Sequence, residues 1–258
     1  MLELERLIRK ASPALEVVVE VGACSGEESL ALAADHPTVR FVAIEANPSL
    51  AAALRRASAG LSNYTVVEAA VASEDGQADF LAFDGEPGIG SLNPVAEAGR
   101  QRYGDRAPSV RKVEAKRLST ICDELRIDTL DVLHVDTQGS DLDVFLSLDQ
   151  NRLERLSVVS LEAARFMPLY EGAPMAASIR SALGRRGFRI FRIDRVHFSY
   201  RNECNYYFVR SNHKWFAEWA YPFHVAAGEL RSVGAWARHR VAVRTRVRQI
   251  VGETGTAR

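Results

Sequence analysis

The feature that most constrains the fold is an apolar run that ends in an acid and two glycines, residues 17–26 (VVVEVGACSG). Its β-branched residues predict a buried strand, and Gly22 and Gly26 predict a tight turn after it. A helical pattern over residues 27–34 and a second apolar strand over residues 39–44 follow. Together they predict a βαβ unit, whose turn brings backbone N–H groups and a helix N-terminus close to a ligand.

The acids near the ends of these two strands indicate which ligand binds. Glu45 stands nineteen positions after Gly26 (45 minus 26), near the spacing at which an acid binds the ribose of an adenosine cofactor. A dinucleotide site requires G-x-G-x-x-G, but Cys24 replaces the middle glycine and the last glycine, Gly26, comes one residue early. Glu20 would repel a pyrophosphate but suits the positive charges of S-adenosylmethionine. The pattern favours this methyl donor over NAD, and an ordinary strand, turn and helix is the alternative.

The composition gives the chain no excess of charge that would favour a polyanion. Its 258 residues are 47% hydrophobic and include 33 basic and 33 acidic side chains, which suits one large α/β domain. We find no run of about 18 apolar residues for a membrane span, and residues 1–10 lack the apolar core of a signal peptide. The three cysteines form no C-x-x-C pair, so the sequence predicts a cytoplasmic protein without disulfides or a metal cluster.

The middle of the chain is less regular. A third strand is predicted at residues 63–68, and residues 69–73 and 78–83 look like a hairpin around an Asp-Gly turn. Residues 84–112 lose periodicity and collect glycine and proline. A loop of this length is usually functional or disordered. We therefore expect a mobile cover over the site, with residues 90–92 as the point that contacts a substrate.

The second chemical stretch is residues 130–141 (LDVLHVDTQGSD). Alternation places His134 and Asp136 on one side of a strand, with Asp136 at its carboxyl end, where ligands of open α/β sheets bind. Asp136 is either a pocket acid facing the methyl donor, the acceptor hydroxyl or a metal, or a turn acid that binds nearby amides. A later strand at residues 158–161 ends at Glu162. The two acids could share a divalent cation or orient a hydroxyl, but two ligands alone do not favour a metal.

Three side chains are candidates for the base that takes a proton from an acceptor hydroxyl: Asp136, His134 and His197. His134 is otherwise explained as a core histidine. His197 lies between the strands predicted at residues 188–193 and 205–210, near the expected pocket mouth.

The chain resembles the FkbM family of S-adenosylmethionine-dependent O-methyltransferases in the order and spacing of several motifs: VEVGACSGEESLALA, FVAIEANP, EAAVASEDG, LHVDTQGSDLDVFLSL, and PLYEG with GFRIFRI and YYFVR. The resemblance covers residues 17–210. It implies the α/β class I methyltransferase fold, a Rossmann-like sheet of about seven strands, one of them antiparallel, with helices on both faces. It also implies methylation of a hydroxyl on a small molecule, a sugar or a polyketide-type natural product.

The resemblance also implies roles for individual residues. Glu20, Gly22 and Gly26 would bind the methionine part of S-adenosylmethionine, Glu45 the ribose, and Asp136 would lie beside the transferred methyl. The cofactor-binding set is completed by Ala23, Ala46 and Ala70, the last of which is equally well explained as a core alanine. Departures from the family pattern at Cys24, His134, Gln138 and Asn205 leave the acceptor and the base open.

The sequence divides into a methyltransferase domain, residues 1–210, and a helical, arginine-rich C-terminal extension, residues 211–258. The extension is expected to dock on the domain or on a second copy in a homo-oligomer, or to bind an anionic partner. A second class of function is therefore a non-catalytic or nucleic-acid-directed Rossmann protein that binds through this tail. Nucleic acid is not favoured, because the N-P-P-[YF] motif of amine methylases is replaced by residues 136–139 (DTQG).

Overall fold

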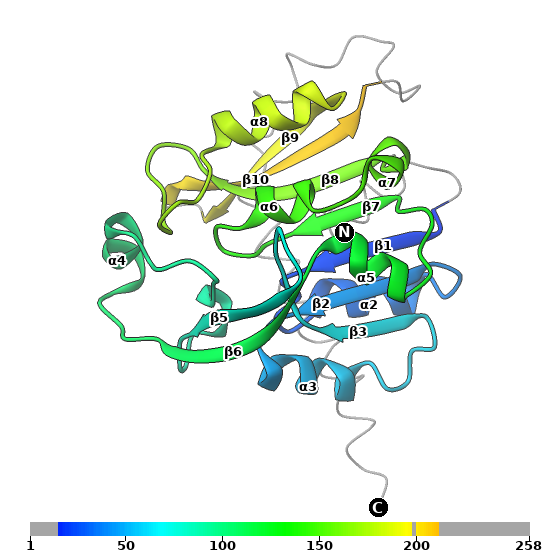
Figure 1. The fold of residues 1–258 in the computed structure, drawn as a ribbon, viewed down its shortest axis with the longest axis horizontal. Coiled ribbons are helices and arrows are strands. Elements are labelled where there is room, and N and C mark those ends of the chain that lie inside the picture. The colour runs from blue at the N-terminus through cyan, green and yellow to red at the C-terminus, as the bar shows by residue number, and fades with distance from the viewer. Residues whose placement is uncertain (1–14, 198–199, 212–258) are drawn as a thin grey trace, which may run out of the picture.

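The computed structural model describes residues 15–197 and 200–211 and is built on a seven-stranded sheet (Figure 1). The strand order is β3-β2-β1-β7-β8-β10-β9. β10 pairs antiparallel with both of its neighbours, whereas the other pairs are parallel. This confirms the predicted class I sheet, with its one antiparallel strand. The strands are β1 (Val17–Val21), β2 (Arg40–Glu45), β3 (Tyr64–Glu68), β7 (Val132–Val135), β8 (Val158–Ala164), β9 (Phe188–His197) and β10 (Tyr200–Arg210).

Helices cover both faces of this sheet, as the buried apolar residues show. Val18 and Phe41 point to one face and pack with Leu30 and Leu54 of α2 (Glu27–Asp35) and α3 (Pro48–Ala57). The other face buries side chains of β1, β2, β7 and β8 against the remaining helices, which lie in front of the sheet in Figure 1. These are α5 (Leu118–Glu124), α6 (Asp141–Leu146), α7 (Gln150–Arg155) and α8 (Ala176–Arg185).

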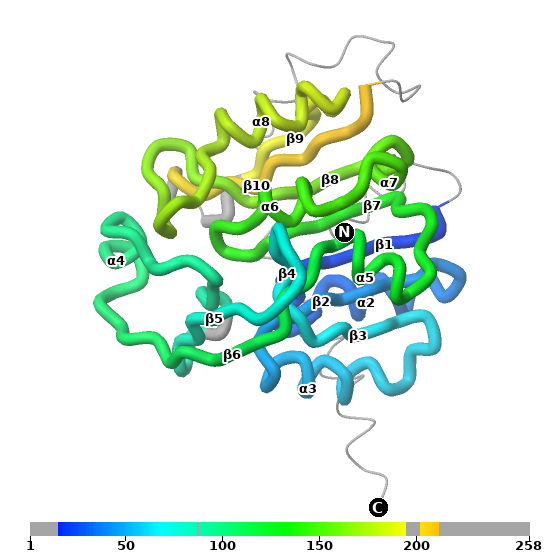
Figure 2. The backbone as a smooth tube through the Cα atoms, in the orientation of Figure 1, coloured from blue at the N-terminus to red at the C-terminus, as the bar shows by residue number. Residues whose placement is uncertain are grey.

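A second, three-stranded sheet extends to the left of the large one (Figure 2) and corrects one prediction. β4 (Ala70–Val71) and β5 (Gly76–Ala82) do not form the expected hairpin, because β6 (Ser109–Lys116) lies between them. β6 pairs antiparallel with all seven residues of β5. Its parallel pairing with β4 involves only two residues of β4. The longer antiparallel ladder outweighs the local turn.

The segment predicted to be irregular, residues 84–112, is partly regular. It contains the 3-10 turn η1 (Pro87–Ile89), the short helix α4 (Glu97–Tyr103) and the start of β6. The Ala96 N–H donates to the Leu169 carbonyl and the Glu171 N–H donates to the Pro94 carbonyl, each at 2.8 Å. These bonds tie the segment to the loop after β8.

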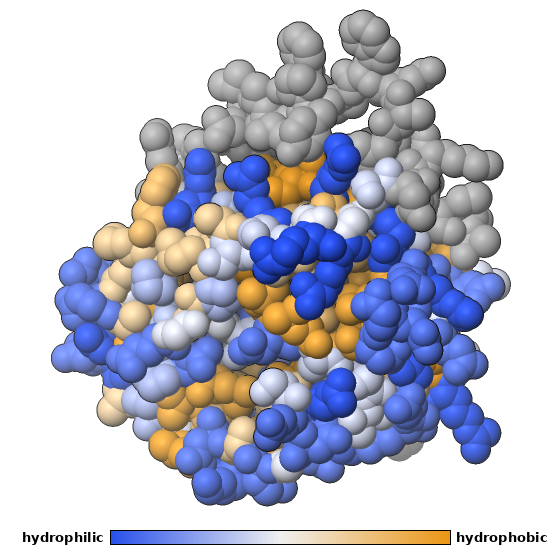
Figure 3. Space-filling model, turned by 45° about the horizontal axis from the view of Figure 1, so that its top comes forward, coloured by the Kyte–Doolittle hydropathy of each residue, from blue (hydrophilic) through white to orange (hydrophobic). Residues whose placement is uncertain are grey.

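Polar and apolar surface alternate on the face shown in Figure 3. The large apolar side chains that are exposed are Val110, Leu146, Phe166 and Met167. Among the described residues, no helix is long and apolar enough to cross a membrane. Except for Ser211, the predicted C-terminal extension lies outside the described residues, so the domain division stays a prediction.

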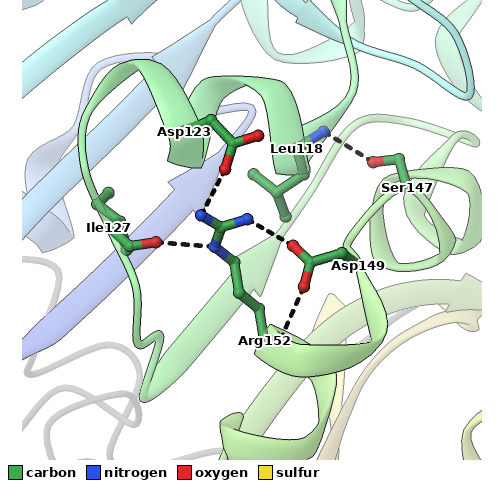
Figure 4. A network of polar contacts seen from close by, with 6 residues as sticks. All are labelled: Leu118, Asp123, Ile127, Ser147, Asp149 and Arg152. Carbon is green, nitrogen blue, oxygen red and sulfur yellow. Dashed lines mark hydrogen bonds and ion pairs between the residues drawn. The ribbon is translucent and has the colours of Figure 1, made fainter.

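Arg152 joins α7 to α5 and to the loop after α5, on the face of the large sheet that these helices cover (Figure 4). Its guanidinium donates to the carboxylates of Asp149 and Asp123 and to the Ile127 carbonyl. The same region caps α5, whose own N-cap residue, Arg117, forms no side-chain hydrogen bond to the helix. Instead, the Leu118 N–H donates to Ser147 Oγ at 2.9 Å. Contacts between separate segments thus hold α5, α6 and α7 against one another.

We predict that Arg152→Ala lowers the free energy of unfolding by about 1–3 kcal/mol, because the hydrogen bonds and packing of a largely buried guanidinium are lost. Urea unfolding followed by circular dichroism measures this change. Arg155→Ala, at an exposed position of the same helix, is the matched control and should change stability by less than about 0.5 kcal/mol. Equal effects of the two substitutions would contradict a specific role of Arg152.

Candidate functional site

The site begins where the turn after β1 packs on the backbone that follows β7. The Asp136 N–H donates to the Val21 carbonyl and the Gly22 N–H to the Ile44 carbonyl, both at 2.9 Å. Gly22 has φ +80°, and a Cβ built on it would lie 1.8 Å from the Asp136 carbonyl oxygen. A side chain at this position would therefore clash with backbone as well as strain φ. Glycine is required here because two strand ends meet.

The turn ends at Gly26, the residue before α2. Gly26 also has positive φ, +62°, and a Cβ there would lie 2.4 Å from Leu54 Cδ1 of α3. The two glycines therefore allow the chain to leave β1 and enter α2 without pushing α3 away. This confirms the tight turn that the sequence predicts.

Glu45, at the end of β2, is held by the two turns beside it. Its Oε2 accepts from the Cys24 N–H at 2.7 Å, and its Oε1 accepts from the Asn47 N–H at 2.8 Å. Burial raises the pKa of this carboxyl, and the two amide donors oppose the rise. The carboxylate is 95% buried (5% exposed) yet lines the cavity described next. It is therefore a fixed acceptor for hydrogen-bond donors of a ligand.

A cavity of about 780 Å³, measured with its open mouth, lies at the carboxyl ends of β1, β2 and β7. The predicted cofactor residues Gly22, Glu45, Ala46, Ala70 and Asp136 line it. Ala69, a cofactor-lining candidate together with Ala70, also lines it. Lining residues that we did not assign to the cofactor are Val21, Cys24, Ile44, Val71, Phe80, Gly88, Gly90, Leu92, Thr137, Gln138 and Ser140.

Two of these lining residues, Gly90 and Leu92, come from the segment predicted to touch a substrate. Ala70 both lines the cavity and packs with Phe80 and Val113 in a small apolar cluster. Both interpretations of Ala70 therefore apply. Periodicity did not indicate that the 3-10 turn or Phe80 would line the cavity, because the small sheet forms through long-range pairing.

Glu20 lies beside the cavity rather than in its lining. It is 7% exposed and pairs across the sheet with His134 of β7. Burial raises the pKa of Glu20 to about 7, and a positive charge on His134 opposes this rise. Glu20 Oε2 and His134 Nδ1 are both buried without a hydrogen-bond partner in the described part of the chain. Ala23 and Gly26 also lie outside the lining, so the cofactor roles of all three stay predictions.

A group of carboxyls surrounds a second hollow, next to the first. Asp141, Glu162 and Glu203 line it together with Tyr170, and Gln138 lines both hollows. Burial and the charges of Asp136 and Glu203 raise the pKa of Glu162 well above its ordinary value. None of the described residues that line either hollow is Lys, Arg or His. The wall is therefore rich in hydrogen-bond acceptors and poor in cations.

Asp141 is the first residue of α6 but does not cap this helix. No side-chain cap forms at the N-terminus of α6. Asp141 instead accepts from the Glu162 N–H and from Thr137 Oγ1, each at 3.0 Å. Burial, followed by the charge of Asp136, raises its pKa to about 7. Asp141 thus connects the ends of β7 and β8.

Glu203 completes the carboxyl group from the antiparallel strand β10. Its Oε1 accepts from the Tyr103 hydroxyl at 2.8 Å, and Arg102 lies 3.9 Å from its Oε2. No sequence pattern predicted Glu203 as a site residue, because its position depends on the register of β10 against β8.

The three candidate bases are not equivalent. Asp136 lines the cavity, whereas His134 faces Glu20 across the sheet and is absent from the lining. His197 ends β9, and its side chain lies outside the described structure. Within residues 15–197 and 200–211, no three His, Cys, Asp or Glu side chains are arranged to hold a metal ion. Binding without a metal stays a prediction.

Comparison with known proteins agrees with this geometry. Residues 20–190 match the model of the "Methyltransferase FkbM domain" family. The chain is 23% identical to the 2-O-methyltransferase NoeI of Sinorhizobium fredii over 55% of its own length and 60% of that protein. It is 26% identical to methyltransferase sdnD of Sordaria araneosa, over 70% of its length and 76% of that protein. The chain thus covers less than two thirds of NoeI.

Solved structures are similar at lower identity. Aeropyrum pernix fibrillarin, with natively bound S-adenosyl-L-methionine, is 12% identical with a TM-score of 0.43, over 80% of this chain and 74% of that one. The N-terminal domain of EvdMO1, with S-adenosylhomocysteine bound, is 11% identical with a TM-score of 0.45, over 81% and 79%.

We predict that Glu45→Ala weakens binding of both S-adenosylmethionine and S-adenosylhomocysteine by about 10- to 100-fold, because two charge-assisted hydrogen bonds to the ribose are lost. Isothermal titration calorimetry measures both affinities. Glu68→Ala is the matched control, since Glu68 lies opposite Glu45 at the end of β3, pairs with Arg55 and does not line the cavity. Unchanged affinity in Glu45→Ala would exclude the ribose role.

We predict that the free energy of unfolding falls as pH rises from about 5 to 8. A carboxyl whose pKa is raised by folding binds more protons in the folded chain, so its contribution is complete below its ordinary pKa and is lost as pH passes the raised value. For Glu20 that value is about 7. Glu20→Gln should therefore be more stable than wild type at pH 8, by on the order of 2 kcal/mol.

Urea unfolding at pH 5 and pH 8 tests this prediction, with Glu154→Gln at an exposed position of α7 as the control. If wild type and Glu20→Gln lose the same stability between the two pH values, Glu20 is not buried as a raised-pKa carboxyl.

Proposed function

Because this chain belongs to the FkbM methyltransferase family, we propose that it transfers the methyl group of S-adenosylmethionine to a hydroxyl of a small molecule, a sugar or a polyketide-type natural product. The match to this family supports methyltransferase activity and the predicted cofactor. The choice of oxygen as the acceptor atom and the acceptor class are the proposed part. The observation that supports them most is the hollow lined by carboxyls beside the cofactor cavity.

The residues of the first cavity fit the cofactor. Glu45 offers a fixed carboxylate to the ribose hydroxyls, and the small residues Ala46, Ala69 and Ala70 leave room for an adenine base. The turn at Gly22 brings backbone close to the methionine part. When bound, S-adenosylmethionine supplies an electrophilic methyl group, whose bond to sulfur breaks as the bond to the acceptor oxygen forms.

The second hollow fits an acceptor with several hydroxyls. Glu162, Glu203 and Asp141 present carboxyl oxygens, and Tyr170 and Leu169 add apolar surface. Carboxyl oxygens accept hydrogen bonds from hydroxyls and hold them in fixed directions. Such positioning is a large part of the rate enhancement available to a two-substrate reaction. A polyanion is a poor fit for the same wall.

Asp136 is the best-supported candidate for the base. It lines the cofactor cavity and neighbours Gln138, which lines both hollows. Its carboxylate would take the proton from the acceptor hydroxyl while the oxygen attacks the methyl carbon. His134 and His197 remain the other two candidates. A nucleic-acid-directed function would depend on residues 211–258, which lie almost entirely outside the described structure.

We predict that Asp136→Asn slows methyl transfer by about 10²- to 10⁴-fold, because the amide cannot accept the hydroxyl proton. S-adenosylhomocysteine should still bind. A labelled-methyl assay on a panel of free sugars and hydroxylated polyketides gives the rate, and calorimetry gives the affinity. Asp143→Asn, at an exposed position of α6, is the control.

His134→Asn distinguishes the candidate bases, since it should retain most of the activity if Asp136 accepts the proton. A loss confined to His134→Asn would move the role to the histidine. Methyl transfer to none of the hydroxylated acceptors, with tight binding of S-adenosylmethionine, would contradict O-methylation of this acceptor class.

A further inference from the structure

Gln138 forms the wall between the cofactor cavity and the second hollow, because it lines both. Its φ is +56°, in the left-handed region that residues with a side chain rarely adopt. Ser91 Oγ donates to its carbonyl at 2.7 Å. Backbone strain of this kind persists only where the surrounding contacts hold it. The fold therefore fixes a glutamine side chain at this wall.

Both ends of the Gln138 amide have partners of matching polarity. Its Nε2 donates to Asp136 Oδ1 at 2.6 Å and to Glu162 Oε2 at 3.0 Å. Its Oε1 accepts from the Tyr170 hydroxyl at 2.9 Å. Reversing the amide would turn its oxygen toward two carboxyl groups. The contacts therefore fix the amide orientation, and both N–H donors are used.

Within the described residues, no cationic side chain lines the hollows on either side of the two carboxyls that this amide joins. The described residues that line the two hollows are uncharged or acidic. Two carboxylates in one site repel each other unless a proton, a cation or hydrogen-bond donors lie between them. Burial and the charge of Asp136 raise the pKa of Glu162 well above its usual range. The donors come from Gln138.

We propose that Gln138 is a positioning residue that occupies the place of a cation between Asp136 and Glu162. Its neutral amide holds the two carboxyl groups together, keeps the Asp136 charge at the cofactor cavity, and orients Glu162 toward the acceptor hollow. This inference rests on the proposed function, because it takes the first cavity as the methyl-donor site. A glutamate of the same length at position 138 would bring three carboxylates together, an arrangement that suits a divalent cation.

Manganese titration of the full chain without cofactor tests the proposal. The loss of the free Mn²⁺ signal in electron paramagnetic resonance reports binding. We expect Gln138→Glu to bind Mn²⁺ at least about tenfold more tightly than wild type, since an added carboxylate raises affinity for hard cations. Adding Asp136→Asn to Gln138→Glu should remove the gain, which locates the ion.

Gln150→Glu is the matched control. Gln150 also donates its amide to a carboxylate, that of Glu154 at 2.9 Å, but on the exposed surface of α7. It should bind Mn²⁺ as weakly as wild type. The proposal is overturned if Gln138→Glu gains no affinity over this control, or if wild type itself binds Mn²⁺ tightly and Asp136→Asn abolishes that binding.

A second variant covers the case in which Gln138→Glu does not fold. Gln138→Leu keeps the size but removes both donors. We expect its preference for positively charged S-adenosylmethionine over S-adenosylhomocysteine to fall about threefold or more, because the Asp136 carboxyl is no longer held at the cofactor cavity once the amide is gone. A purely structural loss would weaken both ligands equally, and that result would overturn the proposal.

The proposed methyltransferase function and the positioning role of Gln138 are tested by different measurements. If wild type binds neither S-adenosylmethionine nor S-adenosylhomocysteine, the proposed function fails whatever Mn²⁺ does. If wild type binds both and the Gln138 variants behave like their controls, only the positioning role fails.

Discussion

The close contact between the turn after β1 and the backbone of Asp136 is the constraint on which the rest of the site depends. Gly22 can lie against the Asp136 carbonyl because it has no side chain, and a Cβ there would be 1.8 Å from that oxygen. The same turn offers the Cys24 N–H to the Glu45 carboxylate. One glycine therefore sets the distance between the ends of three strands. The cavity at the sheet edge follows from that spacing.

The site contains buried carboxyl groups, and the free energy of unfolding falls as these groups become charged. Glu20 and Asp141 both have their pKa raised to about 7, and burial together with neighbouring acids raises the pKa of Glu162 well above its ordinary value. A cationic cofactor is complementary to such a site, because its charge offsets the repulsion among the acids. Stability given up at an active site is a common feature of enzymes. Here it arises from acids on five elements: β1, β2, α6, β8 and β10.

The sequence was most informative where the signal is local. The first βαβ unit, the glycine turn and the acids after β2 and β7 follow from patterns within about ten residues, and Gly22, Glu45 and Asp136 all line the cavity. Features made by long-range pairing were missed. β6 inserts between β4 and β5, and Glu203 reaches the site only through the register of β10 on β8. The alternation of apolar and polar residues within one strand predicts neither the order of the strands nor their register.

A crystal structure of the full chain with S-adenosylhomocysteine tests the central claim most directly. The account predicts the ribose hydroxyls at the Glu45 carboxylate, the amino acid part against the turn at Gly22, and the sulfur on the side of Asp136 and Gln138. A ligand bound away from Gly22 and Glu45, or with its sulfur turned from the second hollow, would contradict it.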